Sequence, residues 1–278
     1  MELSKNLLSH EDMPFAIERH TYHRKSTMNE VHYHDHYEIL YVLENERQIV
    51  VNQQTYSLNQ NTIALIAPYT PHRTIAGERT PQTRILVNFK ESFIHKISTL
   101  FSADALLCFN PASAVISLDE NATAVRRALI EMLKISEGGA TPFGEERCSL
   151  LLFEMLLRLS AGIDSKAQDR SFFDITKYIE THFSEKITLD TISKKFFMSK
   201  FTFLRKFKAH TGVGLPAYIN TIRIINAKKM LSRGERVSDV AMACGFESLS
   251  SFDRAFQKEC DMSPREYKKL VMNQNQKG

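Results

Sequence analysis

The sequence predicts an α+β protein with three parts: an N-terminal antiparallel β-barrel, a helical hairpin, and a C-terminal all-α region with two helix-turn-helix units. Three observations lead to this prediction. Short strand-like segments fill residues 15–90, two helical apolar stripes follow, and one helical pattern then occurs twice, 49 residues apart. The 278 residues are 43% hydrophobic and 24% charged, with few Gly or Pro, which favours folded domains over a disordered chain.

The barrel prediction rests on six short segments that are rich in β-branched and aromatic residues and separated by turn residues. Their spacing is typical of an antiparallel sandwich or barrel. The predicted strands are Phe15–His23, Tyr37–Leu43, Gln48–Val51, Thr62–Ile66, Arg73–Ala76 and Thr83–Phe89.

Histidine and tyrosine side chains cluster before the second and fifth of these strands. The stretch His32-Tyr-His34-Asp-His36-Tyr-Glu38 is followed by Pro68-Tyr-Thr-Pro71-His72. This resembles a cupin barrel, in which a His-x-His-x-x-x-Glu stretch and a later His converge on the barrel interior. The candidate residues for binding a small effector are His32, His34, Glu38, Tyr41 and His72, whereas the lone His36 is expected at the polar surface.

The same cluster allows a second interpretation. Three imidazoles and a carboxylate can bind Fe, Mn, Ni or Zn, because neutral His nitrogen and carboxylate oxygen suit these ions. However, Asn45, Asn61 and Tyr69 stand where cupins usually have Gly, and Thr62 stands where they have Asp. Asn tolerates turn conformations, so the fold is expected to survive better than the chemistry. We therefore expect no metal, no cofactor and no catalytic residue.

Two helices, Glu120–Ser136 and Phe143–Ala161, are predicted after the barrel, separated at Gly138 and Gly139. Each has one apolar stripe at helical spacing. The stripes contain Ala122, Val125, Ala128, Leu129 and Met132 in the first helix and Leu151, Leu152, Met155, Leu156 and Leu159 in the second. Packing in the domain core is the simpler interpretation, but the second stripe also predicts a homodimer. These helices complete a first domain, residues 1–161, and the polar residues 162–171 form the predicted linker.

Residues 172–278 form the second predicted domain, with helix-turn-helix units at about 189–210 and 237–260. The pattern Ser-x-x-x-Phe-x-x-x-Phe occurs at 199, 203 and 207 and again at 248, 252 and 256. Each Ser is placed to cap a helix, and the two Phe, one turn apart, are placed to face the core. A single helix, Leu215–Ser232, joins the units; its 18 residues span roughly 27 Å, the order of the ~34 Å between successive major grooves on one DNA face.

Basic residues are concentrated in this second domain. Residues 172–278 contain 19 Lys and Arg against 11 Asp and Glu, whereas residues 1–171 contain 17 against 21. Residues 186–208 alone contain seven basic residues and one acid. A basic run is usually a solvated face, but this one follows a helix of a helix-turn-helix unit and therefore indicates contact with nucleic-acid phosphates.

About the last hundred residues are similar to the DNA-binding domain of the AraC-type bacterial transcription regulators, which has two helix-turn-helix units joined by a long helix. The residues that carry the resemblance are Ala241, Gly245, Phe246, Phe252, Phe256, Met262, Ser263, Pro264 and Tyr267, with Arg223, Ala227 and Leu231 in the linking helix. Lys206, Asp261 and Lys268 depart from the family pattern, but Asp tolerates the left-handed conformation that ends a helix. A cupin-like barrel is common as the effector-binding half of this family.

The resemblance assigns DNA contacts to the exposed side of the second helix in each unit. Arg205 suits guanine, and Phe201 and Leu204 suit thymine methyl groups. The candidate DNA-binding residues are Lys200, Phe201, Thr202, Leu204, Arg205 and Lys208 in the first unit and Leu249, Ser250, Asp253 and Arg254 in the second. Residues 186–208 have a net charge of +6 and residues 237–262 a net charge of −3, so the first unit is expected to anchor the DNA.

Together these observations predict a sequence-specific DNA-binding transcription regulator controlled by a small-molecule effector in the N-terminal barrel. The alternative is a metal-dependent cupin enzyme that carries a DNA-binding appendage. The expected partners are double-stranded promoter DNA, the effector, a second copy of the chain and RNA polymerase. Four cysteines without metal-type spacing, and no signal or membrane-spanning segment in the sequence, lead us to expect a cytoplasmic protein.

Overall fold

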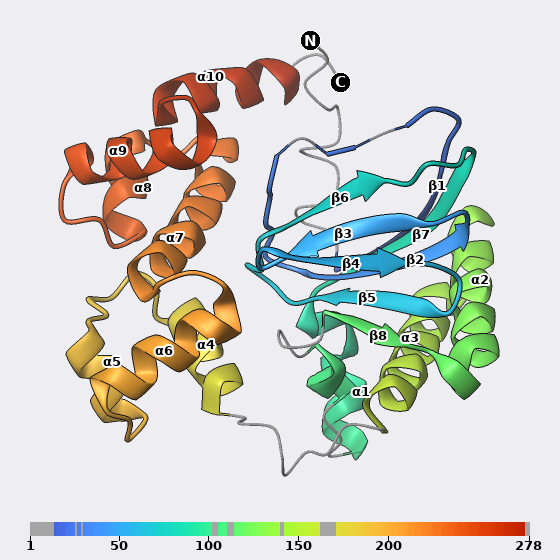
Figure 1. Ribbon diagram of the computed structural model, residues 1–278. Helices are drawn as coiled ribbons and strands as arrows, with labels where there is room; N and C mark the ends of the chain where they lie inside the picture. The colour runs from blue at the N-terminus through green and yellow to red at the C-terminus, as the bar shows by residue number, and fades with distance from the viewer. Residues whose placement is uncertain are drawn as a thin grey trace. The chain divides into compact units, whose positions relative to one another are not determined.

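The computed structural model describes residues 14–25, 27–28, 30–101, 105–109, 114–139, 142–161 and 171–275. The chain divides into two compact units, Met1–Gln168 and Asp169–Gly278 (Figure 1). The predicted linker at residues 162–171 lies outside the described residues except for its last position. Within the described ranges, no helix is both long and apolar enough to cross a membrane.

The N-terminal unit is built on two antiparallel sheets (Figure 1). The larger has the strand order β1-β7-β2-β5-β8, and the smaller has the order β4-β3-β6. The strands are β1 (Phe15–Tyr22), β2 (Tyr37–Glu44), β3 (Arg47–Val51), β4 (Gln54–Leu58), β5 (Thr62–Ile66), β6 (His72–Ala76), β7 (Gln82–Phe89) and β8 (Val115–Ser117). No strand in the described part of the chain belongs to both sheets, so the predicted barrel is not closed.

The sequence prediction lacks two strands and one α-helix of this unit: β4, β8 and α1 (Glu91–Phe101). Strand β4 is mostly polar because only Tyr56 and Leu58 pack on the core between the sheets. Two of the positions where cupins usually have Gly, Asn45 and Tyr69, both adopt a φ of 59°. The turn backbone of the fold is therefore retained without those glycines, as predicted for Asn45.

The larger sheet has two differently covered faces, because successive side chains of a strand point to opposite sides. One face packs on α1 and on helices α2 (Ala122–Glu137) and α3 (Gly144–Ala161). The strand residues buried there include Ile39, Tyr41, Ile63, Ile85 and Val87. The other face meets the smaller sheet, where the core contains Leu40, Val42, Ile49, Val51, Leu58, Ala64 and Ile66.

The leucine stripe of α3 is used within its own unit. Leu152, Met155 and Leu156 have no exposed surface, and Leu159 keeps only 5%. Core packing of this stripe is therefore confirmed, and the predicted homodimer, which stays a prediction, needs another surface. Large apolar side chains are exposed on α1, on α3 and directly before α3: Leu100, Phe101, Leu150 and Phe143.

The C-terminal unit is all-α and repeats one helix pair. Its helices are α4 (Ser171–Thr181), α5 (Leu189–Lys195), α6 (Lys200–Thr211), α7 (Leu215–Ser232), α8 (Val237–Ala243), α9 (Leu249–Cys260) and α10 (Pro264–Asn275). Helices α6 and α9 begin at residues 200 and 249, which confirms the predicted 49-residue repeat, and α7 has the predicted bounds. Asp261 ends α9 with a φ of 53°, as the left-handed tolerance of Asp predicts.

Gly245 shows why the second helix pair packs where it does. Its φ is +79°, and a Cβ there would lie 2.4 Å from the carbonyl oxygen of Ser184, which no side chain allows. Arg223 of α7 donates to the carbonyl oxygens of Phe183 and Glu185 at 2.8 and 2.9 Å, and its guanidinium lies over the ring of Phe246. The loop between α4 and α5 is therefore a fixed support for the second unit.

Candidate DNA interface and ligand-binding sites

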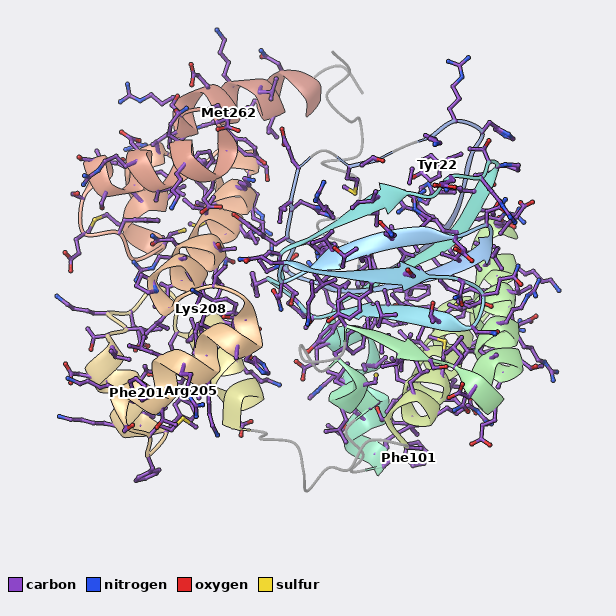
Figure 2. All side chains as sticks on the ribbon, in the orientation of Figure 1. Tyr22, Phe101, Phe201, Arg205, Lys208 and Met262 are labelled. Carbon is purple, nitrogen blue, oxygen red and sulfur yellow. The ribbon has the colours of Figure 1, made fainter. Side chains whose placement is uncertain are left out.

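Helix α6 buries one side and presents the other to solvent. Ser199 caps it, its Oγ accepting a hydrogen bond from the backbone N–H of Thr202 at 3.1 Å. Phe203 and Phe207 are fully buried and stack with ring centroids 5.2 Å apart. The predicted contact residues therefore lie on the outer side of the helix, where Figure 2 labels Phe201, Arg205 and Lys208. Those exposed are Lys200, Phe201, Leu204, Arg205 and Lys208, while Thr202 is half-buried.

Two large apolar side chains on this face are unusually exposed, Phe201 at 78% and Leu204 at 45%. With Arg205, Lys208 and Ala209 they border a shallow surface depression of about 560 Å³. Lys200 forms an ion pair with Asp190 of α5. The face therefore combines apolar groups that suit thymine methyls with cations that suit guanine or phosphate.

Helix α9 repeats the construction with different chemistry. Ser248 caps it in a reciprocal box with Ser251, and Phe252 and Phe256 are fully buried. The predicted contact residues are all exposed: Leu249, Ser250, Asp253 and Arg254. The Nε of Arg254 also donates to the carbonyl oxygen of Ser250 at 3.3 Å, within its own helix.

In the N-terminal unit, four of the five predicted effector residues come together. His32 and His72 form an isolated antiparallel bridge, with both N–H···O distances 3.0 Å. Glu38, near the start of β2, has Oε2 3.3 Å from Nε2 of His34 and Oε1 3.6 Å from Nε2 of His72. One nitrogen or oxygen from each of His32, His34, Glu38 and His72 lies within 4.8 Å of the others; these four residues are called the His/Glu cluster below.

Backbone carbonyls fix the tautomers of two of these imidazoles. Nδ1 of His34 lies 2.9 Å from the carbonyl oxygen of His36, and Nδ1 of His72 lies 2.8 Å from that of Thr70. A carbonyl oxygen only accepts hydrogen bonds, so the proton of each neutral ring is on Nδ1. Both Nε2 atoms then face the carboxylate of Glu38, and each donates to it only when its ring is doubly protonated.

Burial decides the charge of the cluster. It lowers the pKa of His34 to about 4 and that of His32 to about 3, the latter with help from His72. Burial alone would raise the pKa of Glu38, but His34 and His72 outweigh it and hold that pKa well below 4.5. Near neutral pH the carboxylate is therefore ionised, while His32 and His34 are neutral.

Tyr41 does not belong to this group. It follows Glu38 by three residues on β2, so its side chain lies on the opposite, helix-covered face of the sheet. Its hydroxyl donates to the carbonyl oxygen of Gln60 at 3.0 Å. His36, expected at the polar surface, instead stacks on His34 with ring centroids 3.8 Å apart and keeps 13% side-chain exposure.

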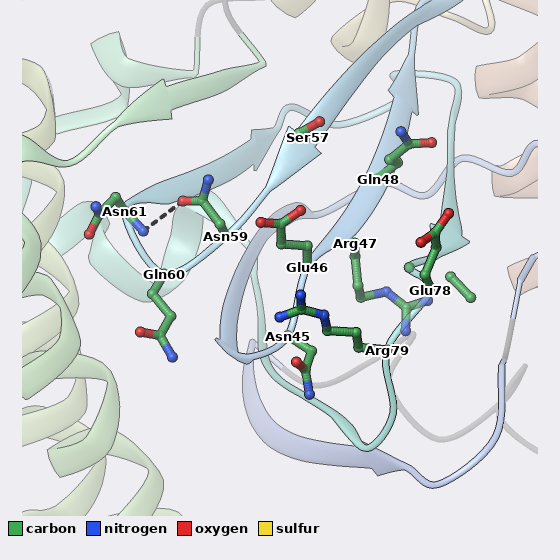
Figure 3. Close-up of a pocket in the computed structure, with 12 residues that line it drawn as sticks. Asn45, Glu46, Arg47, Gln48, Ser57, Asn59, Gln60, Asn61, Glu78 and Arg79 are labelled. Carbon is green, nitrogen blue, oxygen red and sulfur yellow. Dashed lines mark hydrogen bonds between the residues drawn. The ribbon is translucent and has the colours of Figure 1, made fainter.

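Sequence reasoning missed a concave site of about 850 Å³ formed by the β2–β3, β4–β5 and β6–β7 loops (Figure 3). Its lining is polar: Asn45, Glu46, Arg47, Gln48, Ser57, Asn59, Gln60, Asn61, Ala76, Gly77, Glu78 and Arg79. Asn59 Oδ1 accepts a hydrogen bond from the N–H of Asn61 at 2.9 Å (Figure 3). The sequence signal that could have indicated this site is the set of amide and charged residues at the β2–β3, β4–β5 and β6–β7 turns.

The cavity and the His/Glu cluster lie at opposite ends of the smaller sheet, because β3 pairs Arg47 with Ala76 at one end and Val51 with His72 at the other. Arg47 is 2% exposed and donates to Oε1 of Gln82 at 2.8 Å. Burial, and then the charge of Arg84, lower its pKa to about 10, so it stays charged near neutral pH. A buried cation therefore forms part of the cavity wall.

A sheet-rich ligand-binding unit followed by a double helix-turn-helix defines a regulator that responds to a small molecule. The profile of the AraC-like ligand binding domain matches residues 14–156, and that of a helix-turn-helix domain matches residues 192–270. The chain belongs to the AraC family of transcription regulators. Its N-terminal unit is the ligand-binding half, and its C-terminal unit is the DNA-binding half.

Relatives with known names agree with this assignment. The HTH-type transcriptional activator RhaS of Citrobacter koseri is 27% identical over 242 residues, covering 84% of this chain and 86% of RhaS. A crystal structure of ToxT from Vibrio cholerae has a TM-score of 0.58 at 14% identity and covers 92% of this chain and 98% of ToxT. ToxT with a bound unsaturated fatty acid gives 0.56 at 15%, covering 94% and 97%. These structures share the fold of this chain.

Proposed function

We propose that the protein regulates transcription by binding specific promoter DNA with both helix-turn-helix units, under control of a small organic effector. The α6 face carries this proposal. Exposing Phe201 and Leu204 to water is unfavourable in the unbound protein, yet they stand beside Arg205 and Lys208 on a helix whose other side is fully packed. Thymine methyl groups and phosphates would cover both kinds of group.

In this proposal the effector binds in the polar cavity formed by the β2–β3, β4–β5 and β6–β7 loops. The sequence predicts that the effector binds at the His/Glu cluster instead. However, the side-chain nitrogen and oxygen atoms of that cluster lie within 4.8 Å of one another, which leaves no room for an organic molecule between them. The cavity volume of about 850 Å³ falls in the range of small-molecule sites. Its amide, carboxylate and guanidinium lining favours a polar molecule with several hydroxyl or charged groups.

The mechanism is linkage between two sites. An effector that binds one arrangement of the chain more tightly shifts the population toward it, and DNA affinity changes by the same coupling free energy. We assign no catalytic activity to the chain, since its relatives are regulators. A homodimer through the exposed side chains of α1 and α3 and contact with RNA polymerase complete the proposal, in the cytoplasm where bacterial promoters lie.

DNA binding is tested by fluorescence anisotropy on the DNA upstream of the protein's own gene, against a scrambled duplex of equal length. Wild type is expected to prefer the upstream DNA, and Arg205→Ala to lose most of that preference. A wild-type protein that binds both duplexes equally would remove sequence-specific recognition from the proposal.

Effector binding is tested separately by thermal unfolding with a panel of polar metabolites. A ligand that raises Tm of wild type is expected to lose its effect in Arg79→Ala, which alters the cavity. The matched control is Arg73→Ala, on β6 outside the cavity lining. Equal responses in both variants would place the effector elsewhere.

A further inference from the structure

The turn between α5 and α6 presents an aromatic side chain that the fold does not bury. Phe197 is 98% exposed, the highest value among the exposed large apolar side chains of the described structure. Its neighbour Phe196 is half-buried and packs edge-on against Tyr178, with ring centroids 5.9 Å apart. Apolar surface in water is unfavourable, so the ring of Phe197 adds nothing to the stability of the unbound unit.

The backbone at Phe197 is also unusual for a bulky residue. Its φ is 54°, in the left-handed region. The N–H of Phe197 donates to the carbonyl oxygen of Lys194 at 3.2 Å, and that of Met198 to Ser193 at 2.9 Å. This pair of bonds ends α5 in the way that is usual for a helix with a left-handed residue after its last turn, a position that Gly fills without strain.

The second helix-turn-helix unit has the same turn with the expected residue. The N–H of Gly245 donates to Met242 at 2.9 Å and that of Phe246 to Ala241 at 3.0 Å, and the φ of Gly245 is +79°. The backbone requirement is therefore equal in both units, and Gly satisfies it. Strain that a fold does not need, at an exposed position, points to a function for the side chain of Phe197.

The surroundings of this turn are basic and belong to the DNA-binding face. The turn leads directly into α6, whose first residues are the candidate DNA contacts Lys200 and Phe201. On its other side, the last turn of α5 contains the exposed residues Lys194 and Lys195. In helix-turn-helix proteins the first helix crosses the DNA backbone while the start of the second reaches the bases. The turn between them is therefore expected at the edge of the major groove, beside the sugar–phosphate backbone.

We propose that Phe197 packs against deoxyribose of the DNA backbone at the edge of the groove that α6 enters. The inference rests on the proposed DNA binding and adds a contact residue outside both recognition helices. Lysines attract the phosphates by charge, whereas the apolar part of the sugar between them is covered by a ring. Sugar contacts carry no sequence information, so Phe197 raises the affinity for all sequences alike.

The test compares two substitutions in the full chain. Phe197→Gly removes both the ring and the backbone strain, whereas Phe197→Tyr keeps a ring of similar size. The matched control is Leu270→Ala, which removes an apolar side chain that is 43% exposed on α10 of the same unit. Fluorescence anisotropy measures binding to the upstream duplex and to the scrambled duplex at two salt concentrations, and thermal unfolding gives Tm.

We expect Phe197→Gly to have an equal or higher Tm, because the strain is gone. Its affinity should nevertheless fall about 3–10-fold for both duplexes, the order expected for burying part of one ring. The salt dependence should not change, since an uncharged ring releases no counterions. Phe197→Tyr and Leu270→Ala should bind as wild type does.

Four results would overturn the inference. A lower Tm in Phe197→Gly would show that the ring stabilises the fold, and a loss confined to one duplex would indicate a base contact. Binding of Phe197→Gly equal to that of wild type would assign the ring to another partner and leave the proposed function intact. A wild-type chain that binds neither duplex would remove the inference together with the proposed function.

Discussion

The two helix-turn-helix units have the same framework and different surfaces. Both recognition helices have 12 residues, begin after a capping Ser and bury a Phe pair completely. Yet residues 186–208 have a net charge of +6 and residues 237–262 a net charge of −3. Buried and capping positions therefore specify the fold of each unit, while we expect the exposed positions to set its share of DNA binding.

The units also differ in their supports. In the first, Phe207 packs edge-on against Tyr218 of α7, with centroids 5.4 Å apart. In the second, Gly245 approaches the α4–α5 loop, and Arg223 ties that loop to α7. The second unit therefore packs on the α4–α5 loop, a support that the Phe207–Tyr218 contact of the first unit does not use.

The largest expected effect tests whether the framework is equivalent. Phe207→Ala and Phe256→Ala should each lower the free energy of unfolding by about 3–5 kcal/mol, because both rings are fully buried. Denaturant unfolding followed by circular dichroism measures this. Phe201→Ala, at 78% exposure, should cost less than about 0.5 kcal/mol. A clear difference between the two buried positions would mean that one unit relies less on its Phe pair.

The second prediction concerns the support of the second unit. Gly245→Ala should cost about 2–4 kcal/mol, since it adds a left-handed alanine and a clash with backbone. The control, Gly234→Ala, also has a positive φ, but its new Cβ would meet only the end of Met272 at 3.4 Å. It should cost about 1–2 kcal/mol. Equal costs from the same unfolding measurements would show that the contact with Ser184 relaxes easily.

The third prediction addresses DNA directly. Arg205→Ala should weaken specific binding by about 1–3 kcal/mol and relax selection at one base pair. Arg254→Ala should weaken it less, because its surroundings are acidic and its Nε is bonded within α9. The measurement uses operator variants altered in each half, at two salt concentrations.

Two results would change that comparison. If Arg205→Ala weakens binding to all sequences alike, Arg205 contacts phosphate rather than a base. If the half-site that faces the second unit proves the more sensitive one, the division of labour inferred from charge is reversed.

The C-terminal unit was predictable because its signals are local. Helix α7 has the predicted bounds, and the caps at Ser199 and Ser248 are confirmed. Helical periodicity and capping act over one or two turns, so one sequence contains them fully.

The N-terminal sites were less predictable because they depend on contacts between distant strands. The spacing of His32, His34, Glu38 and His72 is sufficient to group them, but strand alternation puts Tyr41, three residues after Glu38, on the opposite face of the sheet. The polar cavity is built from three loops that only the strand pairing brings together. The mostly polar β4 gave no strand signal.

The smallest effect sharpens the comparison most, because it separates stability from recognition. Ser199→Ala and Ser248→Ala each remove an acceptor for the N–H three residues later, at 3.1 and 3.2 Å. Each should cost about 1 kcal/mol of stability. Their effects on DNA should differ, since α6 begins with Lys200 and Phe201 beside its cap, whereas α9 begins with uncharged residues. We expect Ser199→Ala to weaken DNA binding several-fold more than Ser248→Ala, measured by anisotropy at a temperature where both variants are folded. Equal losses would indicate that recognition follows the shared framework, and the exposed charges would then not explain how the two units divide the work.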